Sequence, residues 1–217
     1  MNEEVSTQPE QDKAMLSNIE ARVLGTLMEK QLTTPDQYPL TLNSLVTGCN
    51  QKTSREPMSN YTKGEVEHCV NQLRERKLVE VEYGSRANRF DQRLSRSLFL
   101  DKPAQAVLTI MLLRGPQTIN ELLNRTDRMV RFDNPQAVTE LLNGLLQKTK
   151  PIFMHIPRQS GQREDRYMHL LCGKPDLSTW TSASTSSSVS NDTDLIARVD
   201  ELERQLARVM QELGIEE

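Results

Sequence analysis

The amino-acid sequence predicts a mainly helical α+β protein with small β-hairpins, in which one structural unit occurs twice. The segment "TLNSLVTGCNQ" at 41–51 resembles "TINELLNRTDR" at 118–128. Apolar residues recur at helical spacing from Ser17 onward, and the period then changes to two near Val79. Helices followed by a hairpin, and then the same order again, define the predicted fold class.

The residues on both sides of the repeated segment keep the same order. "VLGTLMEK" at 23–30 matches "VLTIMLLR" at 107–114, and "VEHCVNQL" at 66–73 matches "VTELLNGL" at 138–145. The dipeptide Arg-Phe, which ends at Phe90, has its counterpart in the Arg-Tyr that ends at residue 167. Four matching blocks in one order indicate a duplicated domain.

The first unit reads as three helices and a hairpin. Ser17 and Glu20 form a capping-box pattern at the start of a helix over about 17–32. A short second helix over 40–49 buries Leu42, Leu45 and Val46, and a third runs over about 64–77. The third helix places its apolar side chains on one face: Val66, Cys69, Val70 and Leu73. The hairpin then alternates Val79, Val81 and Tyr83 with Glu80 and Glu82, turns at "GSRAN", and returns through "RFDQRL".

The second unit repeats this order. Pro103 follows Asp101 at the start of a helix over about 103–114, and "TINELLNRT" is the second helix. Asn134 precedes the third helix, whose core-facing residues are Val138, Leu141, Leu142, Leu145 and Leu146. "PIFMHIP" and "DRYMHLL" flank the second hairpin turn. Three helices followed by a two-stranded hairpin form the winged-helix arrangement, so the sequence predicts two tandem winged-helix domains.

The predicted domain map has five parts. We expect a disordered N-terminus at 1–15, winged-helix domains at 16–100 and 101–173, a Ser/Thr-rich linker at 174–193, and an amphipathic helix at 194–215. Apolar residues of that last helix follow a heptad seam: Leu195, Val199, Leu202, Leu206, Val209 and Leu213. The seam predicts a homodimer, and the alternative is a single helix docked on the body of the protein.

Several long strings resemble one bacterial family. They are "EARVLGTLMEKQLTTPDQYPLTLNSL" with "CNQKTSREP", then "LLRGPQT" and "PRQSGQREDRYMHLL". These strings identify the chain as similar to the YceH-like proteins over about residues 16–172. The resemblance implies tandem winged helices and no established activity, and the tail after residue 173 lies outside it.

Composition excludes several classes of function. No apolar run reaches the length of a membrane span, and the polar N-terminus does not read as a signal peptide, so we expect a cytoplasmic protein without membrane contact. Cys49, Cys69 and Cys172 show no paired spacing, which predicts buried or half-buried thiols and no metal site. No catalytic motif or cofactor-binding loop is present, so neither an enzyme nor a cofactor is predicted.

The distribution of charge favours nucleic acid as the partner. The net charge is −3, but residues 1–20 carry −4 and residues 191–217 carry −5, which leaves about +6 between them. Helix three and the wing approach DNA in winged-helix regulators, so basic and polar residues there become candidate contacts. These candidates are Lys52, Thr53, Ser54, Arg55, Lys63, Arg86, Arg89, Arg125, Arg128, Arg158 and Arg163. We therefore predict a regulator that binds duplex DNA.

A protein-binding adaptor with the same fold is the alternative. The connections between helices two and three are about fourteen and about ten residues long, far beyond the three or four of a tight helix-turn-helix. Glu65 and Glu67 at the start of the first unit's third helix would face phosphates unfavourably. Both features favour a protein partner over DNA.

Overall fold

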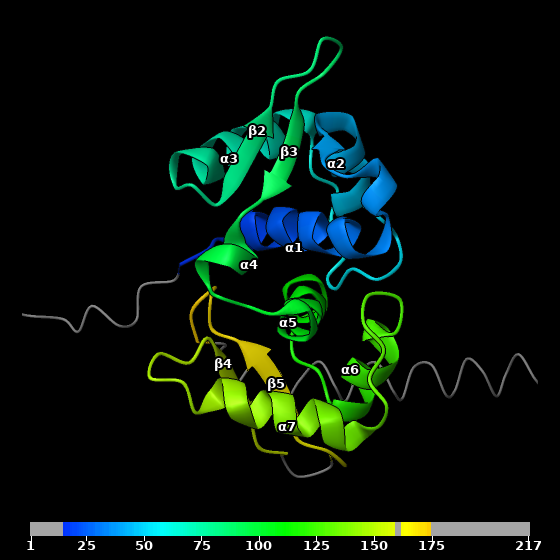
Figure 1. Ribbon diagram of the computed structural model, residues 1–217, viewed down its shortest axis with the longest axis vertical. Coiled ribbons are helices and arrows are strands. Elements are labelled where there is room, and N and C mark those ends of the chain that lie inside the picture. The colour runs from blue at the N-terminus through cyan, green and yellow to red at the C-terminus, as the bar shows by residue number, and fades with distance from the viewer. Residues whose placement is uncertain (1–14, 159–161, 175–217) are drawn as a thin grey trace, which may run out of the picture. The chain divides into compact units, whose positions relative to one another are not determined.

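The computed structural model describes residues 15–158 and 162–174. The chain is mainly helical with small antiparallel hairpins, as predicted (Figure 1). The first half contains α1 (Asn18–Thr33), α2 (Leu42–Cys49), α3 (Lys63–Glu75), β2 (Val79–Glu82) and β3 (Arg89–Gln92). The second half contains α5 (Lys102–Arg114), α6 (Ile119–Thr126), α7 (Pro135–Leu146), β4 (Phe153–Ile156) and β5 (Arg166–His169). Both halves therefore show the order of three helices and a hairpin.

The helix starts follow the capping chemistry of the sequence. The Ser17 backbone N–H donates to the Glu20 carboxylate at 2.8 Å, and the Glu20 N–H donates to the Ser17 hydroxyl at 3.4 Å, which confirms the capping box at α1. Asp101 and Asn134 accept from backbone N–H groups at the starts of α5 and α7. These side chains satisfy N–H groups that a helix leaves without partners in its first turn.

Three short elements were not predicted: η2 (Pro35–Gln37), β1 (Leu40–Thr41) and α4 (Leu94–Ser97). β1 adds a third, antiparallel strand beside β3, so the first sheet has the order β1-β3-β2. Elements of two to four residues carry too few positions for a hydrophobic period to appear in the sequence.

The short strand has a counterpart in the second half. Leu40 pairs with Phe90 in the first sheet, and Gln117 forms an isolated antiparallel bridge to Tyr167 beside the second. Leu40 and Gln117 occupy matching positions of the sequence repeat. Each directly precedes the threonine that caps the second helix of its half. The duplication read from the sequence therefore extends to strand pairing.

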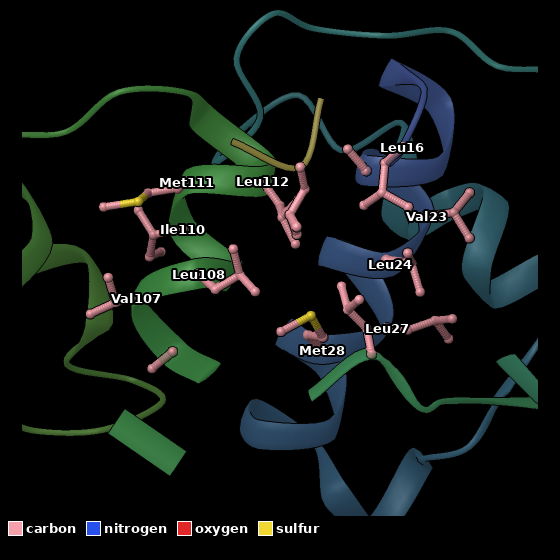
Figure 2. Packing of buried hydrophobic residues seen from close by; sticks show 14 of the residues in the cluster. Leu16, Val23, Leu24, Leu27, Met28, Val107, Leu108, Ile110, Met111 and Leu112 are labelled. Atoms are coloured by element: carbon pink, nitrogen blue, oxygen red, sulfur yellow. The ribbon is translucent and has the colours of Figure 1, made fainter. Parts of the chain in front are cut away.

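One hydrophobic core runs through both halves, with α1 packed on α5. Met28 and Leu108 point toward one another across the contact, and Leu112 points toward α1 from the next turn of α5 (Figure 2). Gly25 permits this approach, because a Cβ there would lie 3.0 Å from the Leu112 Cβ. The Leu16 N–H also donates to the Leu171 carbonyl at 2.7 Å.

The two halves belong to one compact unit. It includes the described residues up to Lys174, and within it the halves share the α1–α5 contact. The division of this unit between residues 100 and 101 stays a prediction. The predicted disordered N-terminus, apart from Met15, and almost all of the predicted linker lie outside the described residues, as does the whole 194–215 helix with its seam. Within the described part of the chain, no helix is both long and apolar enough to cross a membrane.

Candidate functional site

The first predicted recognition helix, α3, presents little positive charge. Its buried side consists of Val66, Cys69, Val70 and Leu73, as predicted. At its start, the Glu65 carboxylate accepts from the Thr62 N–H and hydroxyl, both at 2.7 Å, and these hydrogen bonds lower the pKa of Glu65. Glu67, two residues further on, is exposed. The N-terminal end of α3 therefore carries two carboxylates against Lys63 alone.

The second predicted recognition helix, α7, contains no lysine or arginine. Glu140 is its one charged residue, and the exposed positions around it include Gln136, Asn143 and Gly144. Three of the five predicted core residues of α7 are fully buried, and two are partly buried against the core: Val138, Leu142 and Leu145, then Leu141 and Leu146. The outer face of α7 is polar and carries one negative charge.

Arg55 is not a surface cation, contrary to the sequence prediction. None of its side chain is exposed, and its guanidinium donates to both Glu29 oxygens at 2.7 and 3.2 Å. The same group donates to the Gly48 carbonyl at 3.0 Å and the Ser54 carbonyl at 2.8 Å. Arg55 was predicted to contact phosphate because it lies in a polar loop, but a partner on α1 draws it into the interior.

A second buried arginine holds the same loop. Arg22, on α1, donates to the Pro57 carbonyl at 2.6 Å, to the Cys49 carbonyl at 3.3 Å and to the Ser59 hydroxyl at 3.3 Å. Burial lowers the pKa of Arg22. The long connection between α2 and α3 is therefore a built structure, anchored by two arginines that satisfy its carbonyls.

The remaining candidates of the first half are solvent-facing. Lys52, Thr53, Ser54 and Lys63 are exposed, as are Arg86 and Arg89 of the first hairpin. Arg89 donates to the Pro39 carbonyl at 2.8 Å, which fixes its side chain along the sheet. Exposure keeps these residues available for binding, and their contact with DNA stays a prediction.

The second hairpin carries an ordered polar cluster. The Arg158 N–H donates to Asp165 at 2.9 Å, and Asp165 also lies 2.8 Å from the His155 Nε2. These two hydrogen bonds lower the pKa of Asp165. Arg158 and Arg163 are exposed, whereas Arg166 pairs with Glu121 at 2.9 Å. Both arginines are thus open to solvent, and the Arg158 guanidinium donates to the Arg163 carbonyl at 3.4 Å.

Four of the predicted residues meet at one cleft of about 360 Å³. Thr53 and Ser54 come from the α2–α3 connection of the first half, while Arg125 and Arg128 come from the end of α6 and the residues after it. The ends of α1 and α5 form the rest of the wall. No pattern in the sequence predicts this cleft, because it exists only where the two halves pack together.

Three large apolar side chains of the described residues are more than two-thirds exposed. Met58 is 72% exposed, Tyr83 78% and Phe99 89%. Tyr83 follows β2 in the first hairpin, and Phe99 follows α4 with a positive φ of 51°. A bulky residue at positive φ is strained, so the residues around Phe99 hold its backbone in a conformation that it does not prefer.

The thiols and acidic residues do not suggest a metal centre. Cys49 and Cys69 are free and buried, and Cys172 is half-buried, as predicted. Burial raises the pKa of Cys69 to about 12 and that of Cys172 to about 11, which makes both poor nucleophiles. Among residues 15–158 and 162–174, no group of three His, Cys, Asp or Glu residues is placed to hold a metal ion.

Comparison with known proteins places the chain in a family that has members in several bacteria. Residues 16–162 match the family model described as "Protein of unknown function, DUF480", and the chain belongs to this family. A UPF0502 protein of Cellvibrio japonicus is 60% identical over 203 residues, covering 92% of this chain and 93% of the relative. A UPF0502 protein of Azotobacter vinelandii is 45% identical over 185 residues, covering 85% and 82%. These matches confirm the resemblance found in the sequence.

Proposed function

We propose that the protein is a non-enzymatic tandem winged-helix protein that acts as an adaptor by binding another protein. The repeated order of three helices and a hairpin, with the same strand bridge in each half, supports the winged-helix assignment. The proposal departs from the DNA-binding regulator that the sequence favoured.

The charge of the two recognition helices carries this choice. A helix that enters the major groove lies between two rows of phosphates, where positive charge lowers the free energy of binding and negative charge raises it. The exposed start of α3 carries Glu65 and Glu67 against Lys63 alone, and α7 carries Glu140 without any cation. Such faces suit a protein partner better than a polyanion.

The exposed aromatic side chains support the same conclusion. Aromatic residues are enriched in protein interfaces, where they bury large areas in pockets of the partner. Tyr83 on the first hairpin and Phe99 beyond α4 are both more than three-quarters exposed. Solvent exposure of two such side chains is unfavourable in the free protein, and binding to a partner would relieve it.

Duplex DNA is the second candidate, and the second hairpin favours it. Arg158 and Arg163 are exposed there, and Lys148 and Lys150 follow α7. These cations could contact phosphates along one groove edge without insertion of α7. This mode would give binding that depends strongly on salt and weakly on sequence.

Photo-crosslinking in cells distinguishes the candidates. A photoreactive amino acid is placed at His68 on α3 or at Glu140 on α7, both exposed, and at Asn43 on α2 as the matched exposed control. The adaptor proposal predicts a discrete protein adduct at His68 or Glu140 that resists nuclease and is absent at Asn43. Adducts that nuclease removes, or no adduct at either helix, would contradict the proposal.

A further inference from the structure

The cleft between the two halves is rich in positive charge. Lys30 at the end of α1, Arg114 at the end of α5, and Arg125 and Arg128 at the end of α6 or just after it all line it. Its volume of about 360 Å³ lies in the range of sites for small molecules. The residues thus surround a space that would accept an anionic ligand of modest size.

Neighbouring carboxylates offset only part of this charge. Glu29 lies 3.1 Å from Lys30 but is shared with buried Arg55. Glu56 pairs with Arg114 at 2.7 Å, and Glu121 lies 3.8 Å from Arg125. Glu121 is also held by Arg166 at 2.9 Å, outside the cleft lining. Cations therefore exceed carboxylates around the cleft, and the excess is largest at its α6 side.

The helix ends offer a purely structural reason for part of this charge. Lys30, Arg114 and Arg125 lie in the last turns of α1, α5 and α6, where a cation offsets the partial negative charge of the helix C-terminus. Arg128 has no such explanation, because α6 ends at Thr126. In the described part of the chain, its guanidinium has no hydrogen-bond or ion-pair partner. Arg128 is thus the cation of the cleft that neither a helix end nor an ion pair accounts for.

The rest of the lining suits an organic molecule with a charged group. Ile110, Leu113 and Met129 supply apolar wall, and the Asn124 amide and the Thr53 and Ser54 hydroxyls supply neutral hydrogen-bonding groups. A guanidinium presents its N–H donors in a planar fork that matches phosphate oxygens. A ligand that matches this lining has an apolar part and an anionic group.

We propose that this cleft binds a small organic phosphate, with the phosphate at Arg128 and Arg125 and the organic part against Ile110 and Met129. The site is independent of whether the partner of the protein is another protein or DNA. Thr53 and Ser54 of the first half also line the cleft, so a ligand that fills it stabilises the packed arrangement of the two halves through linkage.

Calorimetric titration of the full chain tests the proposal. The probes are adenosine 5′-monophosphate, glucose 6-phosphate and inorganic phosphate, with adenosine and glucose as uncharged counterparts, all at constant ionic strength set with chloride. At least one organic phosphate is expected to bind more tightly than inorganic phosphate, to raise the melting temperature, and to lose affinity when its phosphate is absent. The nucleotide and the sugar phosphate distinguish which organic body the apolar wall accepts.

Matched variants locate the site. Arg128→Gln removes the unpaired guanidinium and is expected to weaken binding about tenfold, the loss of one charge-assisted contact. Arg131→Gln removes an exposed arginine of the same loop that does not line the cleft, and should leave affinity within about twofold of the parent. Neither change should alter the melting temperature without ligand. Absence of binding by every probe at about 1 mM, equal effects of the two variants, or equal binding of adenosine and its monophosphate would overturn the proposal.

Discussion

Replacement of Arg55 by methionine is expected to destabilise the protein by about 3 kcal/mol. The change leaves the Glu29 carboxylate, 14% exposed, without its bidentate partner. It also leaves the Gly48 and Ser54 carbonyls without the donors that lie at 3.0 and 2.8 Å. Breaking a buried ion pair costs about 3–5 kcal/mol, and Lys30, 3.1 Å from Glu29, retains part of the compensation. We therefore expect a loss of stability at the low end of this range, about 3 kcal/mol.

The loss should depend on pH in a defined direction. Burial alone would raise the pKa of Glu29, but the hydrogen bonds and charge of Arg55, with Lys30, bring it below its ordinary 4.5. In the parent, this contribution to stability is present above about pH 4.5 and is lost as the pH falls further. In the variant, burial is no longer opposed by Arg55, so the pKa of Glu29 rises. The difference between parent and variant should consequently narrow from pH 7 toward about pH 4.

Urea unfolding followed by circular dichroism measures these differences. Lys52→Met, at an exposed position three residues away, is the control and should cost less than about 0.5 kcal/mol. The double variant with Glu29→Gln should lose less stability than the sum of the two single changes, because the two residues contact each other. A loss of stability below about 1 kcal/mol for Arg55→Met would contradict a buried Arg55–Glu29 ion pair. Arg55 would then again be a candidate phosphate contact.

Three further predictions address the core and the tail. Gly48→Ala should destabilise the protein by about 1–3 kcal/mol, because the added Cβ would lie 2.6 Å from the Thr26 Cγ2. Adding Thr26→Ser should reduce that loss of stability, because it removes the methyl group. Thermal melts measure both changes. Burial lowers the pKa of His169 from 6.5 to about 4, so stability should fall by about 3 kcal/mol between pH 6.5 and 4, and His169→Leu should remove that slope in urea titrations at each pH. Leu202→Glu should convert a dimer to a monomer in sedimentation if the tail pairs as its heptad seam predicts; a monomeric parent would leave the docked helix.

Local patterns predicted the elements of the described fold well, because the forces that form them act between residues close in sequence. The capping box at Ser17 placed the start of α1, and the apolar stripe from Val66 placed α3 within two residues of its observed ends. Alternation around Val79 gave the hairpin. The repeated blocks went further, since positions matched in the sequence, Phe90 and Tyr167, form matched strand bridges.

The candidate site was less predictable, because it depends on contacts between distant residues. Arg55 reads as a surface residue until Glu29, on another element, is seen to face it. The cleft at Arg128 forms only when α1, α5 and α6 converge, and no single segment carries its pattern. Phe99 is exposed at a positive φ, and no pattern in the sequence predicts that backbone conformation.

Fluorescence anisotropy with a pool of labelled genomic duplexes, at about 50 mM salt, tests whether the partner is a protein and not DNA. We expect no saturable binding of the duplexes, because α3 and α7 present carboxylates where a groove-binding helix needs cations. Saturable binding would contradict it, above all if the joint change of Arg158 and Arg163 to alanine lowered the slope of log affinity against log salt by about two.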